Sequence, residues 1–122
     1  MSWTKAAGTS LNSVGANVYF GMIVQTITVA EFHQHMVDYE VIDVREPHEY
    51  DDGHISGVKN IPLQDFLDMI SSKTFHPKKT LVIVCRSGRR SGMAVSECMV
   101  HGIPAKNLKG GFEEWCRSYP NG

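Results

Sequence analysis

Long apolar runs, a cysteine framework and a secretory leader are all lacking from this sequence of 122 residues. No stretch approaches the roughly 18 apolar residues of a membrane span, and the N-terminus has no apolar core of about 7–15 residues typical of a signal peptide. The three cysteines are an odd number in a chain long enough to fold without disulfides. We therefore expect a soluble protein of a reducing, intracellular compartment, the cytoplasm.

An excess of charge of either sign is also lacking, because 12 basic and 13 acidic residues give a formal net charge of -1. No overall field favours nucleic acid or an anionic membrane, and we expect neither as a partner. The charge that is there is local. Three of the five arginines lie within five residues, directly after Cys85: Arg86, Arg89 and Arg90. This cluster is the first indication of a functional site.

Acidic residues are missing from residues 1–24, which hold Lys5 as their only base among many Ser, Thr, Gly and Ala residues. We predict a flexible tail over this segment. The remainder, residues 25–122, is of a length and hydrophobic content that suit one globular domain.

From residue 25 onward, short apolar runs alternate with amphipathic segments, which is typical of βα units in a parallel sheet. The strongest strand is Leu81–Val84, four uncharged apolar residues in succession, as expected of a central strand buried on both faces. Further strands are predicted near residues 27, 41–44, 59–61 and 107–108. Helices are predicted over residues 28–37, 47–52, 63–70, 89–101 and 112–117.

Cys85 follows the predicted central strand directly, at the edge of a parallel sheet where ligands bind. The residues after it can curl with several N–H groups pointing inward, because Gly88 tolerates positive φ and a helix begins beside the loop. The helix N-terminus and three guanidinium groups favour a thiolate over a thiol. We interpret Cys85 as a nucleophile, since three like charges beside an inert thiol would serve no purpose.

The other cysteines and the histidines indicate less. Cys98 falls on the apolar stripe of its predicted helix and is interpreted as a core residue, whereas a role of Cys116 as a resolving thiol stays open. The six histidines do not form a metal-binding spacing with the cysteines. We expect neither a metal nor a cofactor.

Three blocks of the sequence resemble the signatures of the rhodanese-like sulfurtransferase family. Asp43–Tyr50, continued by Gly53–Pro62, resembles the N-terminal signature, Val84–Ser91 the active-site loop, and Asn107–Trp115 the C-terminal signature. The blocks occur in the family's order and cover about residues 25–118. The resemblance implies a single-domain, rhodanese-like α/β fold with a central parallel sheet of about five strands flanked by helices.

The resemblance also implies sulfane sulfur transfer from thiosulfate or a related small donor, through a persulfide on Cys85, to cyanide, a thiol or an acceptor protein. Asp43 and Arg45 belong to the first signature; we interpret Asp43 as neutralising a nearby arginine or capping a turn, and Arg45 as supporting the wall of the site. The loop residues that would bind the sulfur and the donor anion are Arg86, Ser87, Gly88, Arg89 and Arg90.

Two alternatives remain open. A phosphatase or an arsenate reductase uses a cysteine in a longer loop, with an arginine after five intervening residues; that place holds Ser91 here, and the basic residue, Arg90, comes one position early. A regulatory or sulfur-carrier module of the same fold would have no turnover, but inactive members of the family commonly lack the cysteine that this chain retains.

Overall fold

The computed structural model describes residues 16–19 and 22–120. The strands are β1 (Ala16–Tyr19), β2 (Met22–Ile27), β3 (Tyr39–Asp43), β4 (Lys59–Asn60), β5 (Thr80–Val84) and β6 (Ala105–Leu108). The helices are α2 (Val29–Gln34), the 3-10 helix η1 (Met36–Asp38), α3 (Pro47–Asp52), α4 (Leu63–Ser71), α5 (Arg89–Val100) and α6 (Gly111–Ser118). No helix in these described ranges is both long and apolar enough to cross a lipid bilayer.

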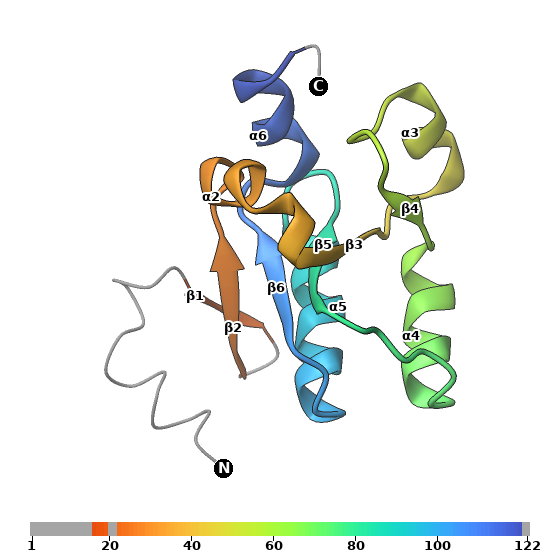
Figure 1. Ribbon diagram of the computed structural model, residues 1–122. Helices are drawn as coiled ribbons and strands as arrows, with labels where there is room; N and C mark the ends of the chain where they lie inside the picture. The colour runs from red at the N-terminus through yellow and green to blue at the C-terminus, as the bar shows by residue number, and fades with distance from the viewer. Residues whose placement is uncertain (1–15, 20–21, 121–122) are drawn as a thin grey trace.

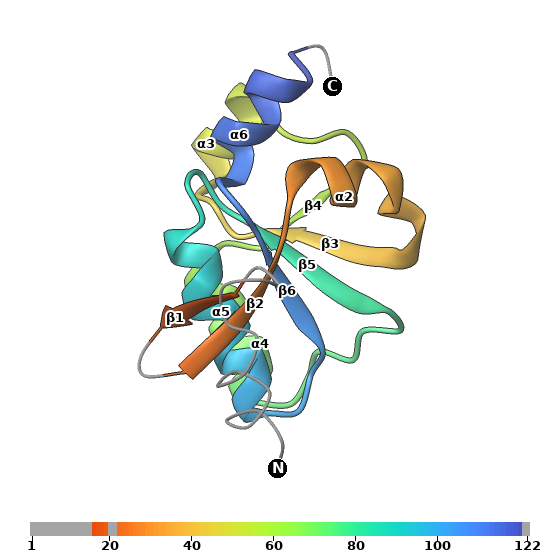
Figure 2. The same cartoon turned by 90° about the vertical axis from the view of Figure 1, so that its left-hand side faces the viewer.

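The strands form one sheet in the order β1-β2-β6-β5-β3-β4. Strands β2 to β6 pair in parallel, and β1 adds an antiparallel strand to the edge of β2. Helices α4 and α5 cover one face of the sheet and α2 lies on the other (Figure 2), while α3 and α6 lie beyond the carboxyl ends of the strands (Figure 1). The predicted fold, a five-stranded parallel sheet flanked by helices, is confirmed.

The central strand β5 lies between β3 and β6, and its four apolar residues have no exposed surface. Leu81 and Ile83 pack with α4 and α5, and Val82 and Val84 pack with α2 and α6, because side chains alternate along a strand. Burying each such side chain contributes roughly 1.5–3 kcal/mol. The same alternation places Cys85 on the α5 face, 1% exposed.

Local signals set several helix ends. Thr28 caps α2 in a reciprocal capping box with Glu31, and Pro47 occupies the first turn of α3, as predicted. The first helix ends at Gln34, earlier than predicted, and its remaining residues form the 3-10 turn η1.

The flexible tail expected over residues 1–24 is wrong for residues 16–19 and 22–24, which belong to β1 and β2. Val24 is fully buried in the core, and Thr26 of the same strand pairs with Asn107 of β6. The sequence predicts a strand only near residue 27, and the structure extends it back to Met22, where residues 22–25 pair with β1. The remaining residues of the expected tail, 1–15 and 20–21, lie outside the described residues.

Candidate active site

The Cys85 loop connects the end of β5 to the start of α5. Gly88 caps α5 with a φ of 107°, a conformation that L side chains rarely adopt, and its N–H donates to Sγ of Cys85 at 3.0 Å. A Cβ on Gly88 would approach no atom closer than 3.7 Å, so the backbone conformation requires glycine here, while the space does not. Sγ therefore lies at the N-terminus of α5, where the helix dipole favours negative charge.

Ser91, in the first turn of α5, adds a side chain to the sulfur. Its Oγ lies 3.3 Å from Sγ of Cys85 and is also within hydrogen-bond distance of Oδ1 of Asn107. Asn107, on the neighbouring strand β6, donates through Nδ2 to the carbonyl of Gly88 at 2.9 Å. Ser91 and Asn107 are both buried, so the sulfur has polar side chains beside it inside the core.

The N-terminus of α6 holds the other side of the loop. The N–H of Phe112 donates to the carbonyl of Cys85 at 2.8 Å, and the N–H of Glu113 donates to that of Arg86 at 3.0 Å. A Cβ on Gly111 would lie only 2.5 Å from the carbonyl oxygen of Cys85, so the loop and α6 approach as closely as glycine allows. Two helix N-termini thus converge on the cysteine, and both raise the local positive potential.

The three loop arginines do not converge on the sulfur. Arg86 is exposed and pairs with Glu113 at 2.9 Å, while Arg90 binds Glu49 of α3 through two contacts. Within the described part of the chain, no acidic side chain pairs with Arg89, which is exposed. The three charges expected to act together are thus divided between two ion pairs and one solvent-facing side chain.

The ion pair between Arg90 and Glu49 shifts the pKa values of both residues. The hydrogen bond from Arg90 lowers the pKa of Glu49 to about 2, against the opposing effect of burial. The same hydrogen bond raises the pKa of Arg90 above its ordinary value. Both groups are therefore charged over the whole range in which a folded protein is normally studied.

Asp43 and Arg45 form a buried ion pair at the end of β3, with Nη2 of Arg45 lying 2.8 Å from Oδ2 of Asp43. Arg45 also donates to the carbonyls of Glu49 and Gly53, and its guanidinium lies 4.4 Å from the centre of the Phe112 ring. The pair ties β3 to α3 and α6. The pair therefore supports the elements around the site, whereas Sγ of Cys85 is contacted by Gly88 and Ser91.

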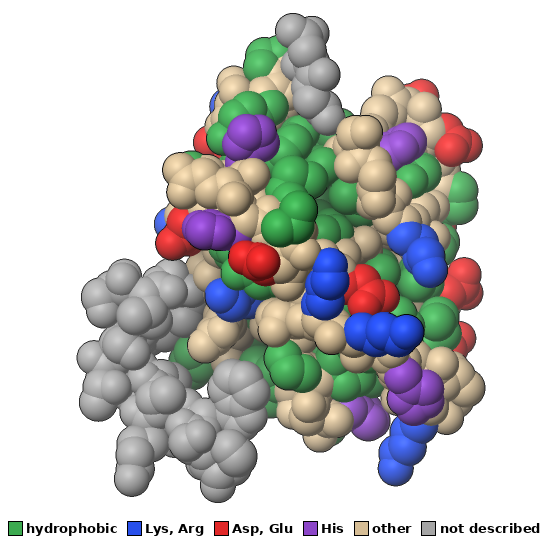
Figure 3. Space-filling model, in the orientation of Figure 1, with side chains coloured by type: hydrophobic (Ala, Val, Ile, Leu, Met, Phe, Trp, Pro, Cys, Tyr) green, Lys and Arg blue, Asp and Glu red, His purple; other side chains and the backbone are tan. Residues whose placement is uncertain are grey.

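A cavity of about 520 Å³ lies between α3 and α6, beside the loop. Arg86 lines it from the loop, Gly53 from the end of α3, and Phe112 and Cys116 from α6. The space-filling view shows hydrophobic side chains gathered between these two helices (Figure 3). Ser87 is exposed next to Arg86, so the loop and the cavity together form the accessible side of the site.

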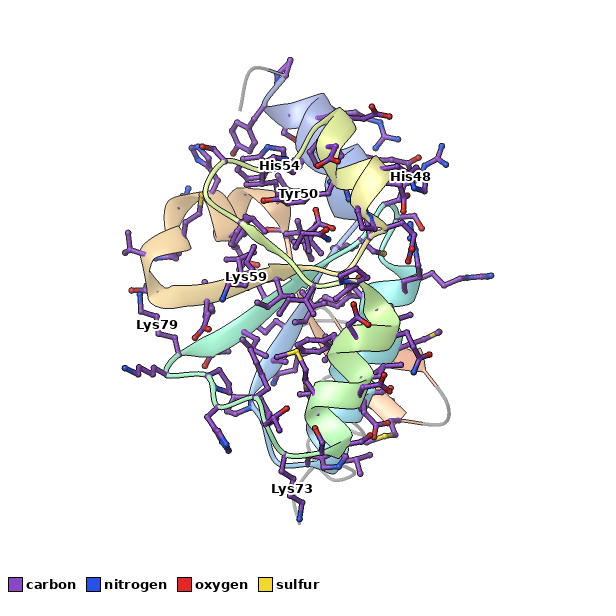
Figure 4. The ribbon with its side chains drawn as sticks, turned by 90° about the vertical axis from the view of Figure 1, so that its right-hand side faces the viewer. His48, Tyr50, His54, Lys59, Lys73 and Lys79 are labelled. Atoms are coloured by element: carbon purple, nitrogen blue, oxygen red, sulfur yellow. The ribbon has the colours of Figure 1, made fainter. Side chains whose placement is uncertain are left out.

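His54 has a structural contact near this cavity. Its ring stacks on Tyr50 with centroids 3.7 Å apart, and its Nδ1 lies 2.8 Å from the carbonyl of Tyr50 (Figure 4).

Cys98 is fully buried in the core, where desolvation raises the pKa of its thiol to about 12. Cys116 is exposed.

The functional residues that sequence reasoning missed are Ser91, Asn107, Glu49 and Gly111. No role at the sulfur is predicted for Ser91, although its place at the end of the block that resembles the active-site loop is a usable signal. Asn107 and Gly111 lie in the third signature, but nothing local showed that they contact the cysteine loop.

The candidate site is thus a cysteine at the carboxyl end of a parallel strand, held by a short loop at the N-terminus of a helix, in a sheet flanked by helices. The chain matches the model of the rhodanese-like domain over residues 28–118, and it belongs to that family.

Known proteins resemble the chain over most of its length. The uncharacterized protein YqhL of Bacillus subtilis is 35% identical over 103 residues, which cover 84% of this chain and 80% of YqhL. Thiosulfate sulfurtransferase GlpE of Stutzerimonas stutzeri is 32% identical over 83 residues, covering 66% of this chain and 73% of GlpE. The crystal structure of a rhodanese-related protein from Thermoplasma volcanium superposes with a TM-score of 0.70 at 29% identity, covering 77% of this chain and 92% of that one.

Proposed function

We propose that the protein is a sulfurtransferase that moves sulfane sulfur from thiosulfate, or a related donor, to a thiophilic acceptor through a persulfide on Cys85. The observation that carries this proposal is the position of Sγ, which receives the N–H of Gly88 at 3.0 Å at the N-terminus of α5. Such an environment stabilises both a thiolate and the persulfide anion that replaces it.

The transfer takes two displacements at sulfur. In the first, the Cys85 thiolate attacks the outer sulfur of thiosulfate, the S–S bond of the donor breaks, and sulfite leaves with its electron pair. In the second, an acceptor such as cyanide attacks the outer sulfur of the persulfide, which forms thiocyanate and returns the thiolate. Neither step needs a general base or an outside oxidant.

The surroundings of the cysteine suit an anionic donor. Cys85 is 1% exposed, whereas Arg86, Ser87 and Arg89 around it are exposed and are the first loop residues that an approaching dianion meets. The relative named as a thiosulfate sulfurtransferase supports this choice of donor. The three cysteines are unpaired, which suits the reducing cytoplasm that we propose as the location.

The physiological acceptor of the sulfur decides whether the protein acts as an enzyme or as a sulfur carrier. A cavity between α3 and α6 could admit a small thiol or the cysteine-bearing segment of an acceptor protein. A sulfur carrier or regulatory module would accept sulfur on Cys85 but release it slowly to small acceptors. A phosphatase or an arsenate reductase is less well supported, because the place of its loop arginine holds Ser91, which is buried and bonded to Asn107.

The test is the mass of the intact protein before thiosulfate, after thiosulfate, and after a subsequent addition of cyanide or a thiol. We expect thiosulfate to add one sulfur atom to Cys85 and cyanide to remove it as thiocyanate. Cys85→Ser should abolish both steps, and Cys116→Ser, the matched control at the exposed cysteine, should retain them within a few fold. Sulfur mapped to Cys116, or hydrolysis of an aryl phosphate that is lost in Cys85→Ser, would contradict the proposal.

A further inference from the structure

Cys85, Gly88, Asn107 and Ser91 form a closed ring of hydrogen-bond contacts inside the core. The N–H of Gly88 donates to Sγ at 3.0 Å, and Nδ2 of Asn107 donates to the carbonyl of Gly88 at 2.9 Å. Oγ of Ser91 completes the ring, because it lies 2.5 Å from Oδ1 of Asn107 and 3.3 Å from Sγ. Asn107 therefore takes part in the ring without touching the sulfur.

The ring has one proton fewer than its contacts require when the cysteine is a thiolate. The carbonyl of Gly88 can only accept, so the amide nitrogen of Asn107 must face it and Oδ1 must face Ser91. The Ser91 hydroxyl carries a single proton, which can go to Oδ1 or to Sγ but not to both. The contact with Oδ1 is the shorter one, and both residues are buried, so an amide oxygen left without a donor would be costly.

We propose that Asn107 is a positioning residue that fixes the direction of the Ser91 hydroxyl proton and thereby sets the basicity of the Cys85 sulfur. With its proton donated to Asn107, the Ser91 oxygen presents a lone pair to Sγ. A thiol S–H can donate to that lone pair, whereas a thiolate faces it as one acceptor facing another. Asn107 thus keeps the Ser91 proton away from the thiolate, while the N–H of Gly88 donates to the sulfur.

The inference rests on the role of Cys85 as the nucleophile of the proposed function, and it explains how a cradle of donors keeps a reactive sulfur. The intrinsic nucleophilicity of a thiolate falls as its basicity falls, and the best attacking thiol titrates near the ambient pH. A loop that only stabilised the anion would give an abundant but weak nucleophile. Asn107 acts against that loss.

Charged groups on the loop and on the elements packed against it act on the same sulfur. They come from the loop, α3, α5, α6 and the end of β3. Most of them form ion pairs, which are Arg90 with Glu49, Arg86 with Glu113, and Arg45 with Asp43. Arg89 is exposed. The variants used below change none of these groups. A change in the titration of Cys85 in those variants therefore reports on the ring.

The test measures the rate of Cys85 alkylation by iodoacetamide as a function of pH, a reaction that needs no sulfur transfer. All proteins carry Cys116→Ser so that this exposed cysteine does not react. In Asn107→Leu, a side chain of similar shape neither accepts nor donates, and the Ser91 proton becomes available to the thiolate. We expect the midpoint of the pH profile to fall by about one unit, the effect of one added hydrogen bond to a charged group, and the plateau rate to fall about threefold.

Asn107 also holds the loop through the carbonyl of Gly88, and the Ser91→Ala background separates the two effects. In that background there is no hydroxyl proton to redirect, so Asn107→Leu should leave the midpoint unchanged. An equal shift in both backgrounds would show that Asn107 acts only on the shape of the loop and would overturn the inference. So would a midpoint that stays constant or rises in Asn107→Leu alone.

A second measurement keeps the test valid if Asn107→Leu does not fold. Below the alkylation midpoint, the S–H stretching band of Cys85, identified by its loss in Cys85→Ser, should lie at lower frequency in the unsubstituted protein than in Ser91→Ala, because the thiol donates to Ser91. Equal frequencies would overturn the inference. A protein that shows this difference and the background-dependent shift, but takes no sulfur from thiosulfate, would support the inference and contradict the proposed function.

Discussion

Arg90 and Glu49 form an ion pair with two parallel contacts, in which Nη1 and Nη2 of the arginine lie 2.8 and 2.9 Å from the two carboxylate oxygens. The pair joins the first turn of α5 to α3, so it fastens the cysteine loop to the element that lines the neighbouring cavity. Two-pronged pairs of this kind fix geometry as well as charge. Arg90 therefore already holds the loop through Glu49 when no substrate is bound.

This pair should make the stability of the loop depend on pH. The folded-state pKa of Glu49 is about 2, below the ordinary 4.5, so the pair stabilises the fold fully above pH 4.5 and loses its effect as the pH falls toward 2. We expect Glu49→Gln to lower the free energy of unfolding by about 1 kcal/mol at pH 7 in urea denaturation. The difference from the unsubstituted protein should shrink as the pH falls from 4.5, because protonated Glu49 resembles glutamine.

Glu113→Gln is the matched control for this prediction, since Glu113 pairs with an exposed arginine, Arg86, and should contribute less. A difference between Glu49→Gln and the unsubstituted protein that stays constant down to pH 2.5 would contradict the assignment of the effect to the Arg90 pair.

Arg89 should contribute more than Arg90 to the use of an anionic donor, because it is exposed and its charge is not offset by an acidic partner among the described residues. We expect Arg89→Gln to lower kcat/KM for thiosulfate about tenfold, the effect of one charge-assisted contact, and to affect a neutral persulfide donor far less. Arg90→Ala should impair both donors alike, because it releases the loop from Glu49.

The control for charge alone is Lys73→Gln, which removes a cation at the far end of the molecule from the site (Figure 4). It should leave the rates with both donors unchanged. Equal losses with both donors in Arg89→Gln would show that Arg89 maintains the loop and does not attract the donor.

Gly111 should be intolerant of a side chain for two reasons that a paired variant separates. Its φ is 61° and an added Cβ would lie 2.5 Å from the carbonyl oxygen of Cys85. Gly102 has a similar φ of 72° but open space around the same position. We expect Gly102→Ala to cost about 1–2 kcal/mol of stability from the backbone alone.

Gly111→Ala should cost at least about 2 kcal/mol more, because α6 must move away from the loop and its N–H groups lose the carbonyls of Cys85 and Arg86. Urea denaturation measures the stability, and sulfur loading measured on the folded fraction reports the site. Equal stability of the two variants would contradict the close packing of α6 on the loop.

Cys98 should be chemically silent in the folded protein, since burial raises the pKa of its thiol to about 12. We expect iodoacetamide at pH 8 to leave Cys98 unmodified in the native protein and to modify it in denaturant, as mapped by mass spectrometry of peptides. Cys98→Ala should reduce stability but keep sulfur loading within a few fold. Loss of loading in a folded Cys98→Ala protein would give this thiol a role in transfer.

Much of the fold could be predicted because the signals are local. The uncharged run Leu81–Val84 predicts a central strand, and Cys85 follows at its carboxyl end. This prediction needs no knowledge of which strands lie beside it. The capping box at Thr28 and the proline at position 47 mark helix starts for the same reason. The family resemblance then supplied the chemistry of the loop.

What the sequence by itself determined about this protein is therefore the order of its elements from β2 onward and the place of the candidate nucleophile Cys85 at the end of β5, both of which depend on residues close together in the chain. Only the tertiary structure decided that two of the three loop arginines are neutralised, one of them by Glu49, and that Asn107 reaches the Ser91 hydroxyl. Only the tertiary structure also decided that the strand predicted near residue 27 begins at Met22, because residues 22–25 pair with β1 while Thr26 and Ile27 pair with β6. These contacts join residues that the sheet brings together from distant parts of the chain, and local pattern carries no information about which polar groups will meet once the strands have paired.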